Sequence, residues 1–276
     1  MDVLETITQF FSYAFLQRAL VVGVLISLCA SLLGVNLVLK RFSMIGDGLS
    51  HVGFGSLAVA AAFNWAPLAV SLPIVILAAF FLLRISERGR IKGDAAIALI
   101  SASSLAIGVF VVSVVTGTNA DIESYLFGSI LALTQTDVVL SVALSAIVIV
   151  VFILFYHRIF AVTFDESYAR ATGMHVGPYN TILALLTALT IVLGMRMMGA
   201  LLISSLIIFP ALSSMWMSRR FSTVTISAAV IGVFCFLLGL MVSFIWKTPT
   251  GASIVLANLL VFIVFYLIHR LRIKKA

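Results

Sequence analysis

The sequence is poor in charge, cysteine and proline. Of its 276 residues only 10% are charged, whereas 63% are hydrophobic, and there are two cysteines and five prolines. A soluble domain usually carries about a quarter charged and about half apolar residues, so this composition excludes a water-soluble globule. Both cysteines, Cys29 and Cys235, lie inside apolar runs. A disulfide scaffold is therefore excluded, and we expect neither cysteine to be bridged.

Long apolar runs recur along the whole chain. A transmembrane helix needs about 20 mostly apolar residues. Nine segments approach or exceed that length: 19–39, 42–64, 66–83, 95–120, 138–156, 179–195, 197–218, 221–246 and 251–268. We therefore predict an all-α fold, a polytopic helical membrane protein with eight or nine transmembrane helices. The count stays open because the connections at 65–67 and at Arg196 leave little room for a turn.

The stretch before the first span has its own character. Phe10, Phe11, Tyr13 and Phe15 precede Arg18. Aromatic residues of this kind favour the plane of the membrane surface, so we predict an N-terminal interfacial helix.

The basic residues indicate the orientation of the chain. With nine spans and the N-terminus outside, all but three of the 17 lysines and arginines fall on the cytoplasmic side. This strong positive-inside bias predicts a multi-pass protein with a cytoplasmic C-terminus. The net charge of +7 is explained in the same way, and we expect a lipid bilayer rather than nucleic acid as the surroundings. No linker divides the chain, so residues 1–276 are predicted to form a single transmembrane domain.

One acidic residue lies well inside an apolar span. Asp47 is followed four residues later by His51, and this spacing places both side chains on one helical face. Counted from Arg41 at about 1.5 Å per residue, Asp47 lies about 9 Å and His51 about 15 Å into the membrane. Ionisable groups at such depth usually line a pathway. Oxygen and nitrogen donors suit Mn²⁺, Fe²⁺ and Zn²⁺.

Two other interpretations of the pair remain open. Asp47 could cap the start of a helix after Gly46, or it could hydrogen-bond to His51 and join two spans. The span also contains Gly48, Gly53 and Gly55, which permit close helix packing or a break in the helix. From the residues alone, an ion pathway and a structural role are about equally favoured.

The cytoplasmic loop 157–178 contains a second candidate feature. Thr163 and Glu166 have the spacing of a capping box, and Gly173 can end a helix in a left-handed conformation. A helix of about two turns is therefore predicted. It could dock a partner or lie on the membrane surface. On the outer side, Asn119, Asp121 and Glu123 could form an ion entry or a contact for a binding protein, although an ordinary solvated loop is the simpler interpretation.

Four runs together resemble a known family. They are LLGVNLVLKRFSMIGDGLSHVGFG (32–55), YLFGSIL (125–131), FDESYARATG (164–173) and MRMMGALLISSLIIFPALSS (195–214). In this order they are similar to the permease subunits of bacterial manganese, zinc and iron importers of the ATP-binding cassette class. The resemblance covers nearly all of the chain.

The resemblance implies a function, partners and site residues. Asp47 and His51 match the metal ligands, and Asp165, Glu166, Ala169, Arg170 and Gly173 match the loop that couples to the ATPase. The implied partners are two cytoplasmic ATP-binding subunits, a second permease copy, and an extracellular or periplasmic metal-binding protein. The implied location is the bacterial inner membrane. No cofactor is expected to be bound permanently, and the metal ion is cargo.

One missing motif bears on the source of energy. No GxxxxGK[ST] phosphate loop occurs in the sequence, so ATP hydrolysis by such a loop is excluded for this chain. The chain is thus expected not to be an enzyme, and the motor must be a separate subunit. The alternative is a proton-coupled secondary metal transporter or channel, in which Asp47 and His51 relay protons.

Overall fold

The fold is built entirely of helices in the residues that the structure, a computed structural model, describes: 14–88, 93–116 and 134–275. In chain order they are α2 (Ala14–Leu39), α3 (Met44–Ala62), α4 (Pro67–Arg88), α5 (Gly93–Thr116), α7 (Gln135–Leu154), α8 (Tyr156–Phe164), α9 (Glu166–Ala171), α10 (Val176–Met198), α11 (Ala200–Met217), α12 (Phe221–Trp246) and α13 (Thr250–Lys275).

Every predicted span coincides with one long helix, which confirms the all-α, multi-pass prediction. Within the described ranges, seven helices are long and apolar enough to cross a membrane, and Pro67–Leu82 in α4 forms a shorter apolar helix. The remaining predicted span corresponds to α3, which has 19 residues and carries Asp47, His51 and four glycines. These residues lower its apolar character, because charged, imidazole and glycine positions contribute little to burial in lipid.

Two predicted boundaries were wrong. Phe15 and Arg18, assigned to an interfacial helix, belong to the first turns of α2, while Phe10, Phe11 and Tyr13 lie outside the described residues. The break between α10 and α11 falls at Gly199, not at Arg196. Gly199 has φ +84°, in the region that glycine adopts most readily. A charged residue such as Arg196 does not itself end a helix.

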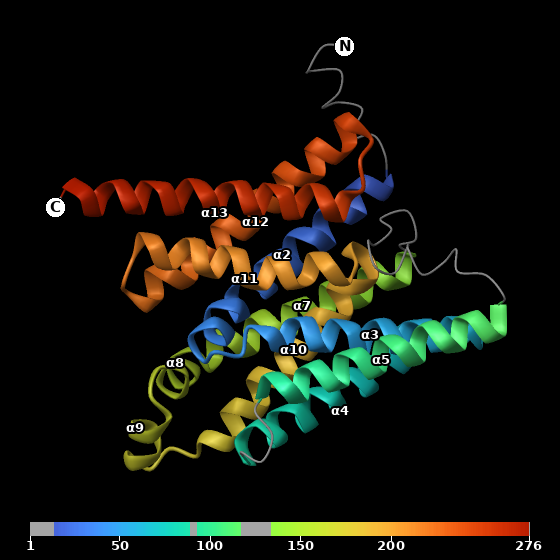
Figure 1. The fold of residues 1–276 in the computed structure, drawn as a ribbon, viewed down its shortest axis with the longest axis horizontal. Coiled ribbons are helices and arrows are strands. Elements are labelled where there is room, and N and C mark those ends of the chain that lie inside the picture. Colours follow the sequence, from blue (N-terminus) through green and yellow to red (C-terminus); the bar gives the residue numbers. More distant parts are fainter. Residues whose placement is uncertain (1–13, 89–92, 117–133, 276) are drawn as a thin grey trace.

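The helix α5 runs alongside α3 (Figure 1), and the glycine contacts of α3 show how closely the two helices pack. A Cβ atom at Gly55 would come within 2.4 Å of the backbone oxygen of Ser104 in α5, and one at Gly48 within 2.6 Å of Ile97. On another side, a Cβ at Gly53 would overlap Met195 of α10 at 2.3 Å. Small residues that let backbones approach are the usual basis of helix packing in lipid. The glycines of α3 therefore let α5 and the Met195 side chain of α10 pack directly against its backbone.

The outer surface of the bundle is apolar. Phe110 and Val114 on α5 and Leu260 on α13 each expose more than 60% of their surface. Large exposed apolar areas mark contact with a membrane. Inside the bundle, Cys29 and Cys235 are buried and free, as predicted. The exposed apolar helices are therefore consistent with a protein surrounded by lipid.

Replacement of Gly55 by alanine tests the close packing of α3 and α5. The new methyl group would meet the Ser104 backbone, which cannot move aside as a side chain can. We expect Gly55→Ala to lower stability by about 1–3 kcal/mol, as overpacking usually does. The measurement is the midpoint of thermal unfolding in detergent.

Gly177→Ala is the matched control, because a Cβ at Gly177 has no atom within 4 Å and the residue is also helical. Alanine is the better helix former, so this variant should unfold at or above the wild-type midpoint. A wild-type midpoint for Gly55→Ala would contradict the packing account.

Candidate functional site

Asp47 and His51 lie on the one open stripe of a buried helix. Fourteen of the 19 residues of α3 are buried. In contrast, the side chain of His51 is 20% exposed and that of Asp47 is 37% exposed. Because α3 packs on its other sides against its neighbours, the pair faces the side that the described residues leave uncovered.

The geometry excludes both structural interpretations of the pair, the helix cap and the direct hydrogen bond. The Nε2 atom of His51 and the Oδ2 atom of Asp47 are 3.7 Å apart, which is too long for a hydrogen bond. The helix begins at Met44, so Asp47 already lies within it and does not cap its start. A direct His51–Asp47 hydrogen bond and a cap are therefore both absent at these positions.

The arrangement fits an ion held between the two side chains. Nitrogen and oxygen ligands bind zinc at about 2.1 Å, so one ion can touch both atoms across a 3.7 Å gap. The second ring nitrogen, Nδ1, is buried and has no hydrogen-bond partner among the described residues. Such an unsatisfied atom requires an explanation such as a ligand or water. The neighbouring Ser50 hydroxyl is occupied, because it donates to the Asp47 carbonyl at 2.7 Å.

The pair supplies only part of a coordination shell. Within the described ranges, no group of three His, Cys, Asp or Glu side chains lies close enough together to hold a metal ion. Asn119, Asp121 and Glu123, predicted at the outer entry, lie outside the described residues, as does the segment 125–131. An ion bound by this pair would therefore need further ligands from outside the described residues of this chain.

The segment 157–178 contains the predicted short helix, but the helix starts at a different residue. Asp165 is the N-cap of α9, since its Oδ1 accepts the Tyr168 backbone N–H at 2.9 Å. The predicted cap, Thr163, belongs instead to α8, and its hydroxyl donates to Asn36 Oδ1 at 3.1 Å. Aspartate caps a helix better than threonine does, which explains the shift. Gly173 has φ +82° and follows α9, as predicted.

Most of the predicted coupling residues belong to α9 or cap it. Ala169 is 1% exposed and packs against Val162 and Val176, so it fixes the helix rather than contacting a partner. Arg170 and Tyr168 are exposed. The exposed side of α9 is therefore the part that a cytoplasmic partner can reach.

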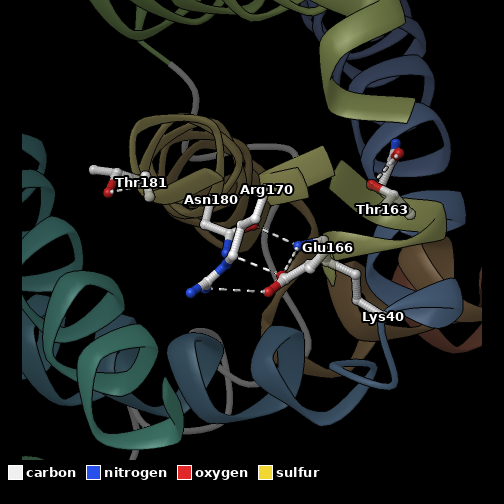
Figure 2. Close-up of polar contacts among 8 residues, drawn as sticks. Lys40, Thr163, Glu166, Arg170, Asn180 and Thr181 are labelled. Atoms are coloured by element: carbon white, nitrogen blue, oxygen red, sulfur yellow. Dashed lines mark hydrogen bonds and ion pairs between the residues drawn. The ribbon is translucent and has the colours of Figure 1, made fainter. Parts of the chain in front are cut away.

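Glu166 anchors α9 to two long helices, a connection that the sequence did not reveal. Its Oε1 accepts from Lys40 Nζ at 2.7 Å and from Asn180 Nδ2 at 3.1 Å, as Figure 2 shows. Lys40 also donates to Asn180 Oδ1, and Arg170 lies 3.8 Å from the second carboxylate oxygen. From the sequence, Lys40 was interpreted only as one of the basic residues that indicate the orientation of the chain, because its partner Glu166 is 126 residues away.

The surroundings of Glu166 keep it ionised. Burial alone would raise its pKa, but the hydrogen bonds from Lys40 and Asn180 and the charges of Lys40 and Arg170 outweigh burial and lower the pKa below its usual value. A lowered pKa means that the anchor is present at neutral pH and is lost only as the pH falls through that lowered value.

Comparison with known proteins gives matches along nearly the whole chain. The sequence profile described as the ABC 3 transport family matches residues 12–269. The chain is 29% identical to the manganese import system permease protein ScaB of Streptococcus gordonii, over 96% of this chain and 95% of that protein. It is 32% identical to the high-affinity zinc uptake system membrane protein ZnuB of Buchnera aphidicola subsp. Acyrthosiphon pisum, over 86% of this chain and 90% of that protein.

A solved structure agrees with the sequence comparisons. The structure described as PsaBC from Streptococcus pneumoniae in complex with Fab matches with a TM-score of 0.85 at 27% identity. The match covers 96% of this chain and 95% of that chain. The arrangement of helices is therefore shared along almost the full length.

Removal of the Asp165 cap tests how α9 is held. We expect Asp165→Ala to destabilise this six-residue helix by about 1 kcal/mol, the usual cost of losing an N-cap. The Tyr168 amide should then exchange its hydrogen about five times faster, measured by hydrogen–deuterium exchange. Asp165→Asn keeps a capping oxygen and is the control. Equal exchange in the two variants would contradict the assignment of the cap.

Proposed function

The chain belongs to the ABC 3 transport family, and from this premise we propose that it is the membrane-spanning permease of an ATP-driven importer of manganese or zinc ions. Relatives named for manganese import and for zinc uptake both match it along most of its length. The chain has no phosphate loop, so ATP hydrolysis is assigned to a separate subunit.

The observation that carries the choice of cargo is the pair on the open stripe of α3. Asp47 supplies a negative charge and an oxygen, and neutral His51 supplies a nitrogen, across the 3.7 Å between Oδ2 and Nε2. This donor set suits Mn²⁺, Fe²⁺ and Zn²⁺, whereas Cu⁺ prefers thiolates and thioethers. The names of the relatives favour manganese and zinc among these ions.

The assembly follows from the family and from the uncovered face of α3. An extracellular or periplasmic metal-binding protein delivers the ion, and two permease copies enclose a pathway to which each contributes Asp47 and His51. The partial shell of two ligands among the described residues is consistent with such sharing. We place the complex in the bacterial inner membrane, with nine spans in a single domain and the C-terminus in the cytoplasm, as the positive-inside bias predicts.

The coupling segment is assigned to Asp165, Glu166, Ala169, Arg170 and Gly173. Asp165 starts α9, Glu166 anchors it, Ala169 packs beneath it and Gly173 ends it. Each of two cytoplasmic ATP-binding subunits would contact the exposed side of this helix. Closure of these subunits on ATP then moves α9, and the spans rock between outward-open and inward-open arrangements.

Substitution of His51 tests the ion pathway. In cells that express this chain with its ATPase and binding protein, His51→Ala should lower the uptake of radiolabelled manganese or zinc at least about tenfold, because loss of a metal ligand costs at least as much as loss of an outer-shell partner. Uptake is compared at matched membrane abundance. The ion that wild type accumulates identifies the cargo.

His175→Ala is the control, because His175 is exposed at the start of α10 and makes no capping bond there. Undiminished uptake in His51→Ala would remove the pair from the pathway. A second arm of the assay dissipates the proton gradient while ATP is held constant. If uptake then stops, a proton-coupled secondary transporter or channel replaces the proposal.

A further inference from the structure

Lys40 is a nearly buried cation at the end of α2. Its side chain is 5% exposed, and its ammonium group contacts Glu166 of α9 and Asn180 of α10 (Figure 2). Removing a charge from water is costly unless the charge is paired and hydrogen-bonded. Separation of Lys40 from Glu166 would leave that ammonium group in a closed site without its carboxylate. The two residues therefore have to move together.

A second bond lies one helical turn earlier on α2. Asn36 is fully buried, and its Oδ1 accepts from the Thr163 hydroxyl of α8 at 3.1 Å. Positions 36 and 40 are four apart, so they share one face of α2. The α8–α9 segment is thus attached to the last turns of α2 at two points, one of them charged.

The chain turns sharply from Lys40 into α3. The Arg41 N–H donates to Val38 O at 3.0 Å and the Phe42 N–H to Leu37 O at 2.8 Å, while Arg41 adopts φ +61°. The helix α3 starts at Met44, and Asp47 lies in its first turn. A hydrogen-bonded turn of so few residues has little freedom, so a shift of Lys40 moves the first turn of α3.

We propose that Lys40 is a positioning residue that transmits the movement of α9 through the α2–α3 turn to Asp47 and His51. The inference rests on the proposed function and deepens it, because it assigns the step between ATPase docking and the ion pathway to one ion pair. Through Asn180 the same pair also draws in α10, which packs against Gly53 of α3. Lys40 does not touch the ion itself.

The test measures transport and hydrolysis in the same sample. The complete complex is reconstituted in proteoliposomes with its ATPase and metal-binding protein. Uptake of manganese, uptake of zinc and ATP hydrolysis are all recorded. Lys40→Met keeps the length and packing of the side chain but removes its charge. Glu166, which is 39% exposed, can still be hydrated in this variant. We expect the number of ions imported per ATP to fall about tenfold while hydrolysis continues.

Two further variants separate coupling from folding. The double variant Lys40→Glu with Glu166→Lys exchanges the charges, and Asn180 can serve either order because its amide both donates and accepts. The double variant should restore the number of ions imported per ATP to the wild-type value. Arg219→Met removes a positive charge that is exposed in the connection between α11 and α12, outside the α2–α3 turn, and should leave the number of ions imported per ATP unchanged.

The outcomes are distinct. A wild-type ratio in Lys40→Met, or equal loss of uptake and hydrolysis in that variant, would overturn the proposal. The charge-exchanged double variant tests the proposal even if Lys40→Met fails to assemble. An assembled double variant that imports few ions per ATP overturns the proposal, and one that imports as many ions per ATP as wild type supports it. If wild type imports neither manganese nor zinc with ATP, the proposed function fails, and the inference that depends on it fails too.

Discussion

The close approach of neighbouring helices to α3 is the constraint on which the rest of the structure depends. A side chain at Gly55 would overlap the backbone of α5, and one at Gly53 would meet the end of the Met195 side chain of α10. With its other sides filled, α3 presents Asp47 and His51 along the remaining stripe. Ionisable groups within a membrane span are costly. Tight packing keeps the two groups at a fixed separation, on the side of α3 that the described residues leave uncovered.

The helix α3 is also joined to α9 by a short connection. From the exposed side of α9, the path runs through Glu166 and Lys40 to the turn that begins α3. A helix of six residues has little stability of its own, so its anchors decide where it sits. Helix packing and one partly buried ion pair together connect the exposed side of α9 with Asp47 and His51.

Local patterns predicted much of this arrangement. The nine apolar runs coincide with nine of the helices that the structure describes, the spacing of Asp47 and His51 placed them on one face, and Gly173 adopts the left-handed conformation. Long-range contacts could not be predicted in this way, because nothing near Lys40 in sequence indicates a carboxylate 126 residues away. The break at Gly199 and the Asp165 cap were missed since two local signals competed at each site, and backbone conformation and capping strength decided between them.

The central claim, that Asp47 and His51 hold the ion, is tested most directly by pulsed electron paramagnetic resonance of Mn²⁺ bound to the complete complex. With isotopically labelled histidine, the account predicts a nitrogen coupling from a directly bound imidazole. This coupling should vanish in His51→Ala and persist in His175→Ala. A manganese signal without nitrogen coupling, or a coupling that survives in His51→Ala, would contradict the account.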